Sequence, residues 1–321
     1  MGGAAARLFL LCALLAASSG AAGAAEGRAI WIWEKPSFAM LDDAEARAEG
    51  LSFLVSHGIT TAYLYADAFE GRNPLVEEPE KYAAWIRDAH DRGMEVHALL
   101  GSAYLRTWEY VLPAKRATAL KMLADVLDYN AAQPPEGSFD GVNIDVEPYL
   151  LKEWKADRRA VAKQYLELSA AFMEMKRSKK SRIPISAAIP FWYDGIREFD
   201  WDGETKQLHQ HVQDMYDFVA IMDYRDSAKG RDGIISHATD ELEYAAEIGR
   251  GVVVGVETGE SVPKKVTFRE EGPARLEAEL RIAKRAFKKY ESFLGFAIHD
   301  YRAYRELVAR PDGAPDPADN N

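Results

Sequence analysis

Three polar side chains alternate with aliphatic ones in the segment 139–147, which reads FDGVNIDVE. Alternate side chains of an extended strand point to the same face, so Asn143, Asp145 and Glu147 share one face. Carboxyl groups that are buried close together raise one another's pKa. A carboxylic acid that stays protonated near neutral pH can give its proton to a leaving group. We therefore expect Glu147, the last of the three along the chain and the outermost, to act as a general acid.

The elements that would position this row are short apolar segments that recur along the chain. Eight such segments, mostly apolar as strands buried on both faces must be, are predicted as strands: 28–33, 60–67, 94–102, 139–147, 183–192, 218–224, 252–257 and 294–300. Strict alternation with helices predicts a parallel sheet. Eight repeats in about 300 residues predict an α/β fold, a single-domain (β/α)8 TIM barrel over residues 25–310.

Amphipathic segments between the strands are predicted to be helices, for example 42–57, 79–92 and 274–290. They repeat apolar residues at spacings of three and four, and several end at a glycine such as Gly58 or Gly251. In barrels of this kind the catalytic groups lie at the C-terminal ends of the strands. The end of the predicted fourth strand, with Glu147 followed by a proline, is therefore where we expect the active site.

The segment 139–147 resembles the signature of family 18 glycoside hydrolases, the chitinases and endo-β-N-acetylglucosaminidases. All nine positions satisfy that pattern, and Met222-Asp223-Tyr224 resembles the Met-x-Tyr segment of the same family. The resemblance implies a TIM barrel that cleaves a β-linked glycan containing 2-acetamido sugars. It implies that Glu147 protonates the glycosidic oxygen, that Asp145 orients the 2-acetamido group and that Tyr224 binds the acetamido oxygen. The acetamido oxygen would be the nucleophile, an exception to the two-carboxylate rule.

Three positions depart from the family pattern. Arg225 follows Met222-Asp223-Tyr224 where the family has an acidic residue. Asn143 stands where the family has an inner aspartate, and we expect it to anchor Asp145. His299 stands on the eighth strand, where the family carries the tryptophan that lies under the sugar.

Further residues near the predicted strand ends are expected to contact the sugar. Flat rings stack on the apolar faces of sugars, and polar groups bind hydroxyls. The expected substrate-binding residues are Trp33, Tyr65, Asp67, Trp192, Met222, Glu257 and His299. The loops after the third and fifth strands, 104–112 and 192–204, are expected to border the groove and to supply the rings of Trp108, Tyr110, Trp192 and Trp201.

Three alternatives remain open at this point. Glu257 ends the seventh strand, where retaining two-glutamate glycosidases carry their nucleophile, with Glu147 then the acid/base. A second alternative is a catalytically weak, carbohydrate-binding barrel. A third is a metal-assisted hydrolase that uses Asp145, Glu147 and His299. The favoured interpretation needs no cofactor and no metal.

The composition and the first residues of the chain indicate the location of the protein and the class of its partners. Residues 1–24 contain one cation, Arg7, an apolar run and a small-residue stretch, which predicts a signal peptide and a secreted or periplasmic protein. The only cysteine, Cys12, lies in that segment, so no disulfide is expected in the mature chain. A formal net charge of −11 disfavours nucleic acid as a partner. We expect an oligo- or polysaccharide substrate, no membrane insertion after signal removal, a monomer, and a disordered tail at 311–321.

Overall fold

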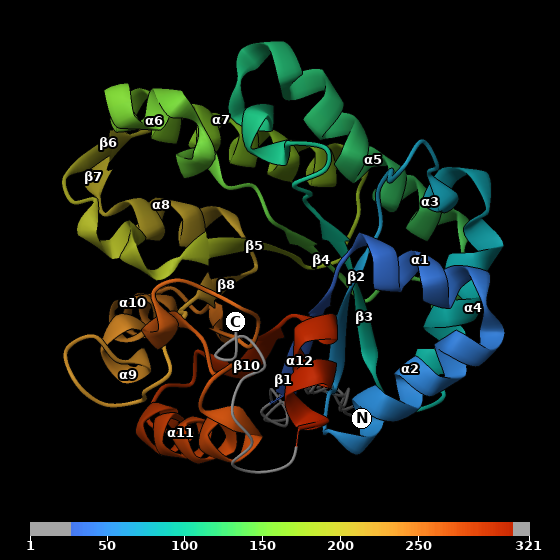
Figure 1. Ribbon diagram of the computed structural model, residues 1–321. Coiled ribbons are helices and arrows are strands. Elements are labelled where there is room, and N and C mark those ends of the chain that lie inside the picture. Colours follow the sequence, from blue (N-terminus) through green and yellow to red (C-terminus); the bar gives the residue numbers. More distant parts are fainter. Residues whose placement is uncertain (1–26, 311–321) are drawn as a thin grey trace, which may run out of the picture.

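The computed structural model describes residues 27–310 of the chain; the predicted signal peptide and the predicted disordered tail lie outside this range. Eight parallel strands close into a barrel and follow one another around it in chain order (Figure 1). Their bounds are β1 Gly27–Ile32, β2 Thr61–Tyr65, β3 Glu95–Leu100, β4 Gly141–Ile144, β5 Ile185–Pro190, β8 Phe218–Met222, β9 Gly251–Glu257 and β10 Phe293–His299. The prediction of a (β/α)8 barrel is confirmed, strand for strand.

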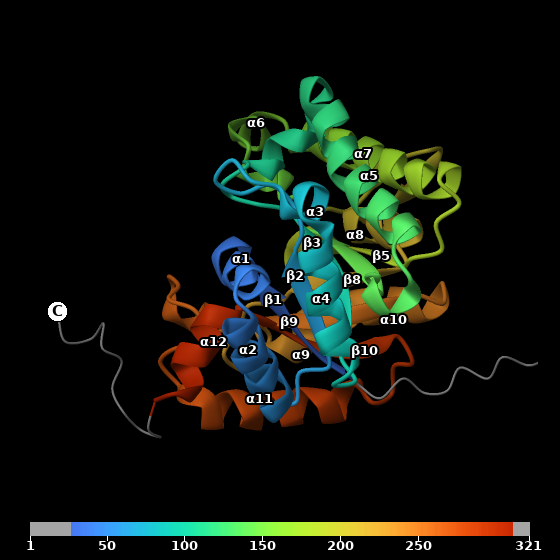
Figure 2. The same ribbon diagram turned by 90° about the vertical axis from the view of Figure 1, so that its right-hand side faces the viewer.

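Helices connect successive strands and surround the barrel, with α5, α6 and α7 on one side and α11 on the opposite side (Figure 2). The α-helices are α1 Glu34–Asp42, α2 Ala44–Ser56, α3 Pro74–Glu77, α4 Pro79–His90, α5 Arg116–Ala132, α6 Lys152–Ala156, α7 Arg158–Ser178, α8 Leu208–Met215, α9 Ile234–His237, α10 Thr239–Glu247, α11 Gly272–Phe287 and α12 Tyr301–Val308. Short 3-10 turns are η1 Thr107–Val111, η2 Pro113–Lys115, η3 Pro135–Gly137, η4 Pro148–Leu150, η5 Phe191–Gly195 and η6 Lys264–Val266. In the part of the chain described, no helix combines the length and apolarity that crossing a bilayer needs.

The apolar core has two layers. The larger lies between the barrel and the helices, and the smaller fills the barrel interior around Trp31, Tyr63 and Leu99. The ring centroids of Trp31 and Tyr63 lie 5.3 Å apart, and those of Tyr63 and His97 lie 5.6 Å apart. The interior below the site is therefore a packed support for the residues above it.

Strand β4 shows the predicted alternation. Its residues Val142 and Ile144, with Val146 beyond its end, pack in the outer layer, which turns Asn143 and Asp145 inward. The strand is shorter than predicted, so Asp145 and Glu147 follow its last residue. Carboxyl groups at this position face the mouth of the barrel and not its sealed interior.

One element was missed and one local prediction was wrong. The loop after β5 contains a two-stranded antiparallel hairpin, β6 Phe199–Trp201 with β7 Glu204–Lys206, which sequence patterning missed because each strand has only three residues. Gly251 begins β9 and does not end a helix. Gly249, with a φ of 66°, takes the left-handed conformation after α10. Gly58, with a φ of 70°, plays the predicted role after α2.

Candidate active site

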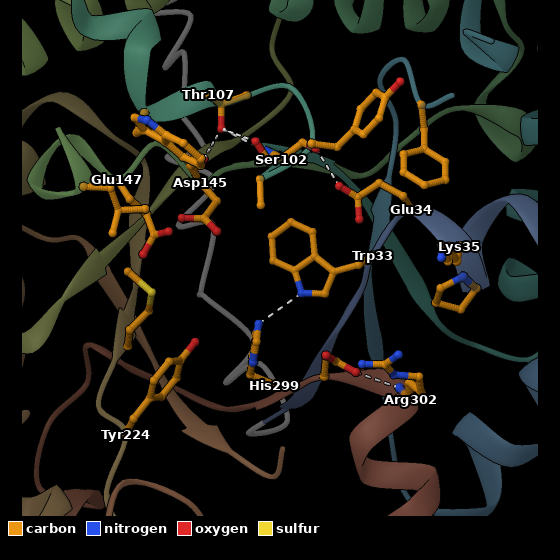
Figure 3. A pocket seen from close by; sticks show the side chains of 18 residues that line it. Trp33, Glu34, Lys35, Ser102, Thr107, Asp145, Glu147, Tyr224, His299 and Arg302 are labelled. Carbon is orange, nitrogen blue, oxygen red and sulfur yellow. Dashed lines mark hydrogen bonds between the residues drawn. The ribbon is translucent and has the colours of Figure 1, made fainter. Parts of the chain in front are cut away.

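A cavity of about 620 Å³ opens at the C-terminal ends of the strands. Figure 3 shows Trp33 in its middle, with Asp145 and Glu147 on one side and His299 and Tyr224 beneath. Of the predicted site residues, the structure brings six together around it: Trp33, Asp145, Glu147, Met222, Tyr224 and His299. They come from the ends of four strands, β1, β4, β8 and β10, which is where a barrel of this type assembles catalytic groups.

Two of the four carboxyl groups that line the cavity, those of Asp145 and Glu147, are held in an environment that favours their neutral forms. Burial and then the charge of Glu147 raise the pKa of Asp145 well above its ordinary value. Burial also raises the pKa of Glu147, although a hydrogen bond from Tyr149 and the charge of His299 act in the opposite direction. Asp145 Oδ1 is buried without a hydrogen-bond partner in the described structure. Glu147 therefore has the properties of a protonated acid, and Asp145 beside it has an oxygen that is free to bind a ligand.

The backbone around Asp145 is fixed by its neighbour strand. The Asp145 amide donates to the carbonyl of Leu100 at 2.6 Å, which continues the pairing of β3 with β4. Gly101 follows at a φ of 148°, and a Cβ there would lie 2.2 Å from the Asp145 carbonyl oxygen. Only glycine permits this close approach of the two chains.

Tyr149 is a residue that the sequence analysis missed. Its hydroxyl donates a hydrogen bond to Glu147 Oε1, and its ring packs edge-on against Trp192 at 5.2 Å between ring centroids. The hydrogen bond fixes the Glu147 carboxyl group and favours its ionised form. A tyrosine two residues beyond a predicted catalytic glutamate, across the turn made by Pro148, was the available signal.

Asn143 does not anchor Asp145 as expected. Its Oδ1 accepts a hydrogen bond from Trp31 Nε1 at 3.0 Å, and its Nδ2 donates to Ser186 Oγ at 2.9 Å. The side chain is fully buried one layer deeper in the barrel and does not line the cavity. Its bonds indicate a structural role for Asn143, because the amide satisfies two buried polar partners.

Glu257 and His299 form a connected pair under Trp33. His299 Nδ1 lies 2.8 Å from Glu257 Oε2, and Glu257 Oε1 accepts from the amides of Thr258 and Gly259 at 2.8 and 2.6 Å. Burial opposes ionisation of Glu257, but these bonds and the charge of His299 outweigh it and lower its pKa. Glu257 does not line the cavity, so the expectation that it contacts substrate is not supported by its position.

Three other predicted contacts also lie away from the cavity lining. Tyr65 is buried, with its hydroxyl donating to the carbonyl of Ala68, and the Asp67 carboxylate accepts from the Ala68 amide. Trp192 packs against Tyr149, behind the acid. The loop after each strand directs these side chains toward nearby protein groups. Their position at a strand end does not by itself reveal this.

The bordering loops contribute less than predicted. Trp108 lines the cavity, whereas Tyr110 is buried and Trp201 belongs to the β6–β7 hairpin, beside a separate small hollow. The cavity wall on this side is apolar instead: its further members, which the sequence analysis missed, are Phe69, Tyr104 and Leu150. Tyr104 and Leu150 are exposed. Exposed apolar side chains at a cavity mouth are surfaces on which a sugar ring can pack.

The metal-assisted alternative has no support in the side-chain arrangement. Among residues 27–310, no group of three or more His, Cys, Asp and Glu side chains is placed to hold a metal ion. Both ring nitrogens of His299 lie within hydrogen-bond distance of protein groups, Glu257 on one side and Trp33 on the other. A metal ion would have to displace one of them.

Comparison with known proteins gives likeness in structure alone. No protein-family model and no curated protein matches the chain in sequence. A family 18 chitinase from Pseudoalteromonas aurantia is similar in structure, with a TM-score of 0.54 and 13% identity over 88% of this chain and 99% of that chain. A chitinase from Chromobacterium violaceum has a TM-score of 0.51 and 10% identity over 89% and 100%. An exo-β-1,4-mannosidase from an Opitutaceae bacterium has a TM-score of 0.55 and 13% identity over 85% and 51%.

These similarities support the barrel fold and its size. At 10–13% identity they carry the fold alone, and the activity of each neighbour is a property of that neighbour.

Proposed function

We propose that the protein is a glycoside hydrolase that cleaves a β-linked glycan containing 2-acetamido sugars, with Glu147 as the general acid. The observation that carries the proposal is the raised pKa of Glu147 in a cavity lined by aromatic rings. A protonated carboxyl group can give its proton to the glycosidic oxygen as the bond breaks. Trp33, in the middle of the cavity, offers a flat face to the sugar.

The remaining polar groups support participation of the substrate in its own cleavage. Asp145 has a buried oxygen without a partner in the described structure, and Tyr224 points its hydroxyl into the same cavity (Figure 3). An acetamido group placed between them can be oriented through its N–H and its carbonyl oxygen. Its oxygen then attacks the anomeric carbon while Glu147 protonates the departing oxygen, so the protein supplies no nucleophile.

The two-glutamate alternative requires Glu257 to face the sugar. Its oxygens instead accept from His299, Thr258 and Gly259, and Glu257 does not line the cavity. A carboxylate occupied in this way has no free oxygen directed at an anomeric carbon. The arrangement supports a positioning role for Glu257 toward His299.

The central experiment compares the wild-type protein with Glu147→Gln on a panel of chitin, peptidoglycan, N-glycan and exopolysaccharide fragments. The variant keeps the shape of the side chain but has no proton to transfer, so turnover should fall by roughly 10²-fold to 10⁴-fold. Circular dichroism and thermal unfolding of both proteins control for folding. Near-normal turnover by the variant would contradict the proposal.

Substrate assistance has its own test. Fragments that lack the 2-acetamido group should not be cleaved, and a thiazoline analogue of the cyclic intermediate should bind far more tightly than substrate. Cleavage of plain glucosides with covalent trapping of Glu257 by a fluorosugar would favour the two-glutamate mechanism. Binding of fragments without turnover by the wild-type protein would favour a carbohydrate-binding barrel.

We also propose that the protein acts outside the cytoplasm. The support is the sequence of residues 1–24, with Arg7 before an apolar run and a small-residue stretch. Expression of the full chain with N-terminal sequencing of the product is the test: a mature N-terminus near Ala25 is expected, and a retained Met1 would contradict the proposal.

A further inference from the structure

The cavity lining carries two basic side chains on one side. Lys35 and Arg302 lie across Trp33 from Glu147 (Figure 3). They are the lysine and arginine side chains of the cavity lining within the described residues. Both are exposed, and within residues 27–310 neither forms an ion pair. Glu34 and Asp300 line the same end, so the two cations are distinguished by the absence of an ion pair and not by an excess of positive charge.

The fold brings these two cations together by strand register. Ile30 of β1 pairs with Ile298 of β10. Lys35 lies in the first turn of α1, just beyond β1, and Arg302 lies in the first turn of α12, just beyond β10. Because paired parallel strands end side by side, the two helices begin at the same edge of the cavity, and each contributes one cation to it.

The nearby carboxylates are bound to other groups. Glu34 Oε1 accepts a hydrogen bond from Ser102 Oγ at 2.5 Å. Asp300 Oδ1 accepts from the backbone amides of Arg302 and Ala303 at 2.8 and 3.1 Å, which caps α12. Neither carboxylate forms an ion pair with the side chain of Lys35 or Arg302. The long cationic side chains therefore remain available to a ligand in the cavity.

We propose that this end of the cavity is a subsite for an anionic substituent, a carboxylate or a sulfate, on the bound glycan. This inference rests on the proposed function and adds the chemical class of its substrate: an acidic or acid-substituted glycan in place of a neutral one. The guanidinium group of Arg302 presents a planar fork of donors that matches two oxygens of such a group, and Lys35 adds a point charge.

The test measures binding to the Glu147→Gln variant, in which cleavage does not interfere. The probes are a β-1,4-linked N-acetylglucosamine tetramer and matched tetramers that carry one 6-carboxylate or one 6-sulfate at successive sugar positions. At low salt, at least one anionic tetramer should bind roughly tenfold more tightly than the neutral one. The advantage should shrink as salt rises. The carboxylate and sulfate arms show which of the two anions the subsite takes.

The substitution that isolates the subsite is Lys35→Gln with Arg302→Gln in the same background. It should abolish the preference for the anionic tetramer, with less than about a twofold change for the neutral one. The matched control is Lys180→Gln with Arg182→Gln, two exposed cations just before β5, at the other end of the barrel. This control removes the same formal charge and should leave the preference intact, which separates a local subsite from a general charge effect.

The outcomes distinguish the subsite from the proposed function. Equal binding of all tetramers, with cleavage of the neutral one by the wild-type protein, overturns the subsite and leaves the hydrolase. A preference that survives loss of both cations also overturns the subsite. A preference that disappears with them, without turnover of any tetramer or of any fragment of the substrate panel by the wild-type protein, supports the subsite and overturns the hydrolase. Absence of binding by every tetramer overturns the subsite, and the substrate panel then decides on the hydrolase.

Discussion

Trp33 Nε1 donates a hydrogen bond to His299 Nε2 at 3.0 Å. An indole nitrogen can only donate, so His299 Nε2 must be the acceptor and its proton must lie on Nδ1, directed at Glu257. The geometry therefore specifies the tautomer of the neutral ring; protonation of His299 places a hydrogen on Nε2 as well and removes the acceptor for Trp33. A chain of hydrogen bonds from Glu257 through His299 to Trp33 fixes the orientation of the ring in the middle of the cavity. The histidine at the end of β10 thus holds the tryptophan that follows β1.

The first prediction concerns the pKa of His299. Burial opposes its charge, but the hydrogen bond and charge of Glu257 outweigh burial and raise the pKa to about 8, while donation from Trp33 favours the neutral ring. The Trp33→Phe substitution removes that donor and should raise the pKa of His299 further. Glu257→Gln removes the charge and should lower it. Titration of the histidine ring signals by NMR measures both shifts.

A matched control for this titration is Trp85→Phe, a fully buried tryptophan packed between the barrel and its helices. It should leave the titration of His299 unchanged. A lower pKa of His299 in Trp33→Phe would contradict the assignment of the tautomer.

The second prediction separates positioning from nucleophilic catalysis at Glu257. If the carboxylate only orients His299, Glu257→Gln should reduce kcat/KM by roughly tenfold, far less than Glu147→Gln, because no covalent step is lost. Steady-state kinetics of the two variants on one substrate provide the comparison. A loss at Glu257 as large as that at Glu147, with rescue by added azide, would identify Glu257 as the nucleophile.

The sequence predicted most of the fold because its signal is repeated. Eight apolar strands and the alternation of Val142, Ile144 and Val146 with polar neighbours each carry periodic information, and the structure follows it. Strand β4 is shorter than predicted and ends at Ile144, but Asp145 still lies on the predicted face. The β6–β7 hairpin was missed because a three-residue strand contains too little periodicity to detect.

The site was predicted less completely, for a physical reason. Strand-end position indicates which residues reach the mouth of the barrel, and this succeeded for Trp33, Glu147 and His299. It does not indicate where a side chain turns after the strand ends: Tyr65 folds back to bond the Ala68 carbonyl. Partners contributed by a turn, such as Tyr149, depend on three-dimensional contacts that no periodic pattern encodes.

The third prediction concerns the free energy of unfolding and its pH dependence. The folded protein holds Asp145 with a raised pKa, so it binds a proton that the unfolded chain releases above its ordinary pKa. Stability should therefore fall as pH rises above about 4. Asp145→Asn removes this penalty and should raise the free energy of unfolding at pH 7 by on the order of 1 kcal/mol or more, with little gain at pH 3. Urea unfolding at both pH values is the measurement; an equal change at both would contradict the assignment.

The fourth prediction concerns the pH profile of catalysis. Burial raises the pKa of Glu147, while the hydrogen bond from Tyr149 lowers it by stabilising the carboxylate. Tyr149→Phe removes that bond, so the pKa of Glu147 should rise further. Because Glu147 must be protonated to act, the alkaline limb of kcat/KM should move to higher pH. The maximal rate should fall by roughly tenfold, since the carboxylate formed as the proton leaves loses a charge-assisted hydrogen bond.

The control for this profile is Tyr129→Phe, which removes a hydroxyl that donates to the Gly137 carbonyl, outside the cavity lining. Its pH profile should match that of the wild-type protein. Tyr149→Phe differs from a general loss of packing because only a change at Glu147 moves the alkaline limb; a defect in folding lowers the amplitude of the profile and leaves the limb in place. If the alkaline limb stays fixed or moves to lower pH in Tyr149→Phe, the prediction is contradicted. The group whose deprotonation ends turnover would then not be a Glu147 that is hydrogen-bonded to Tyr149.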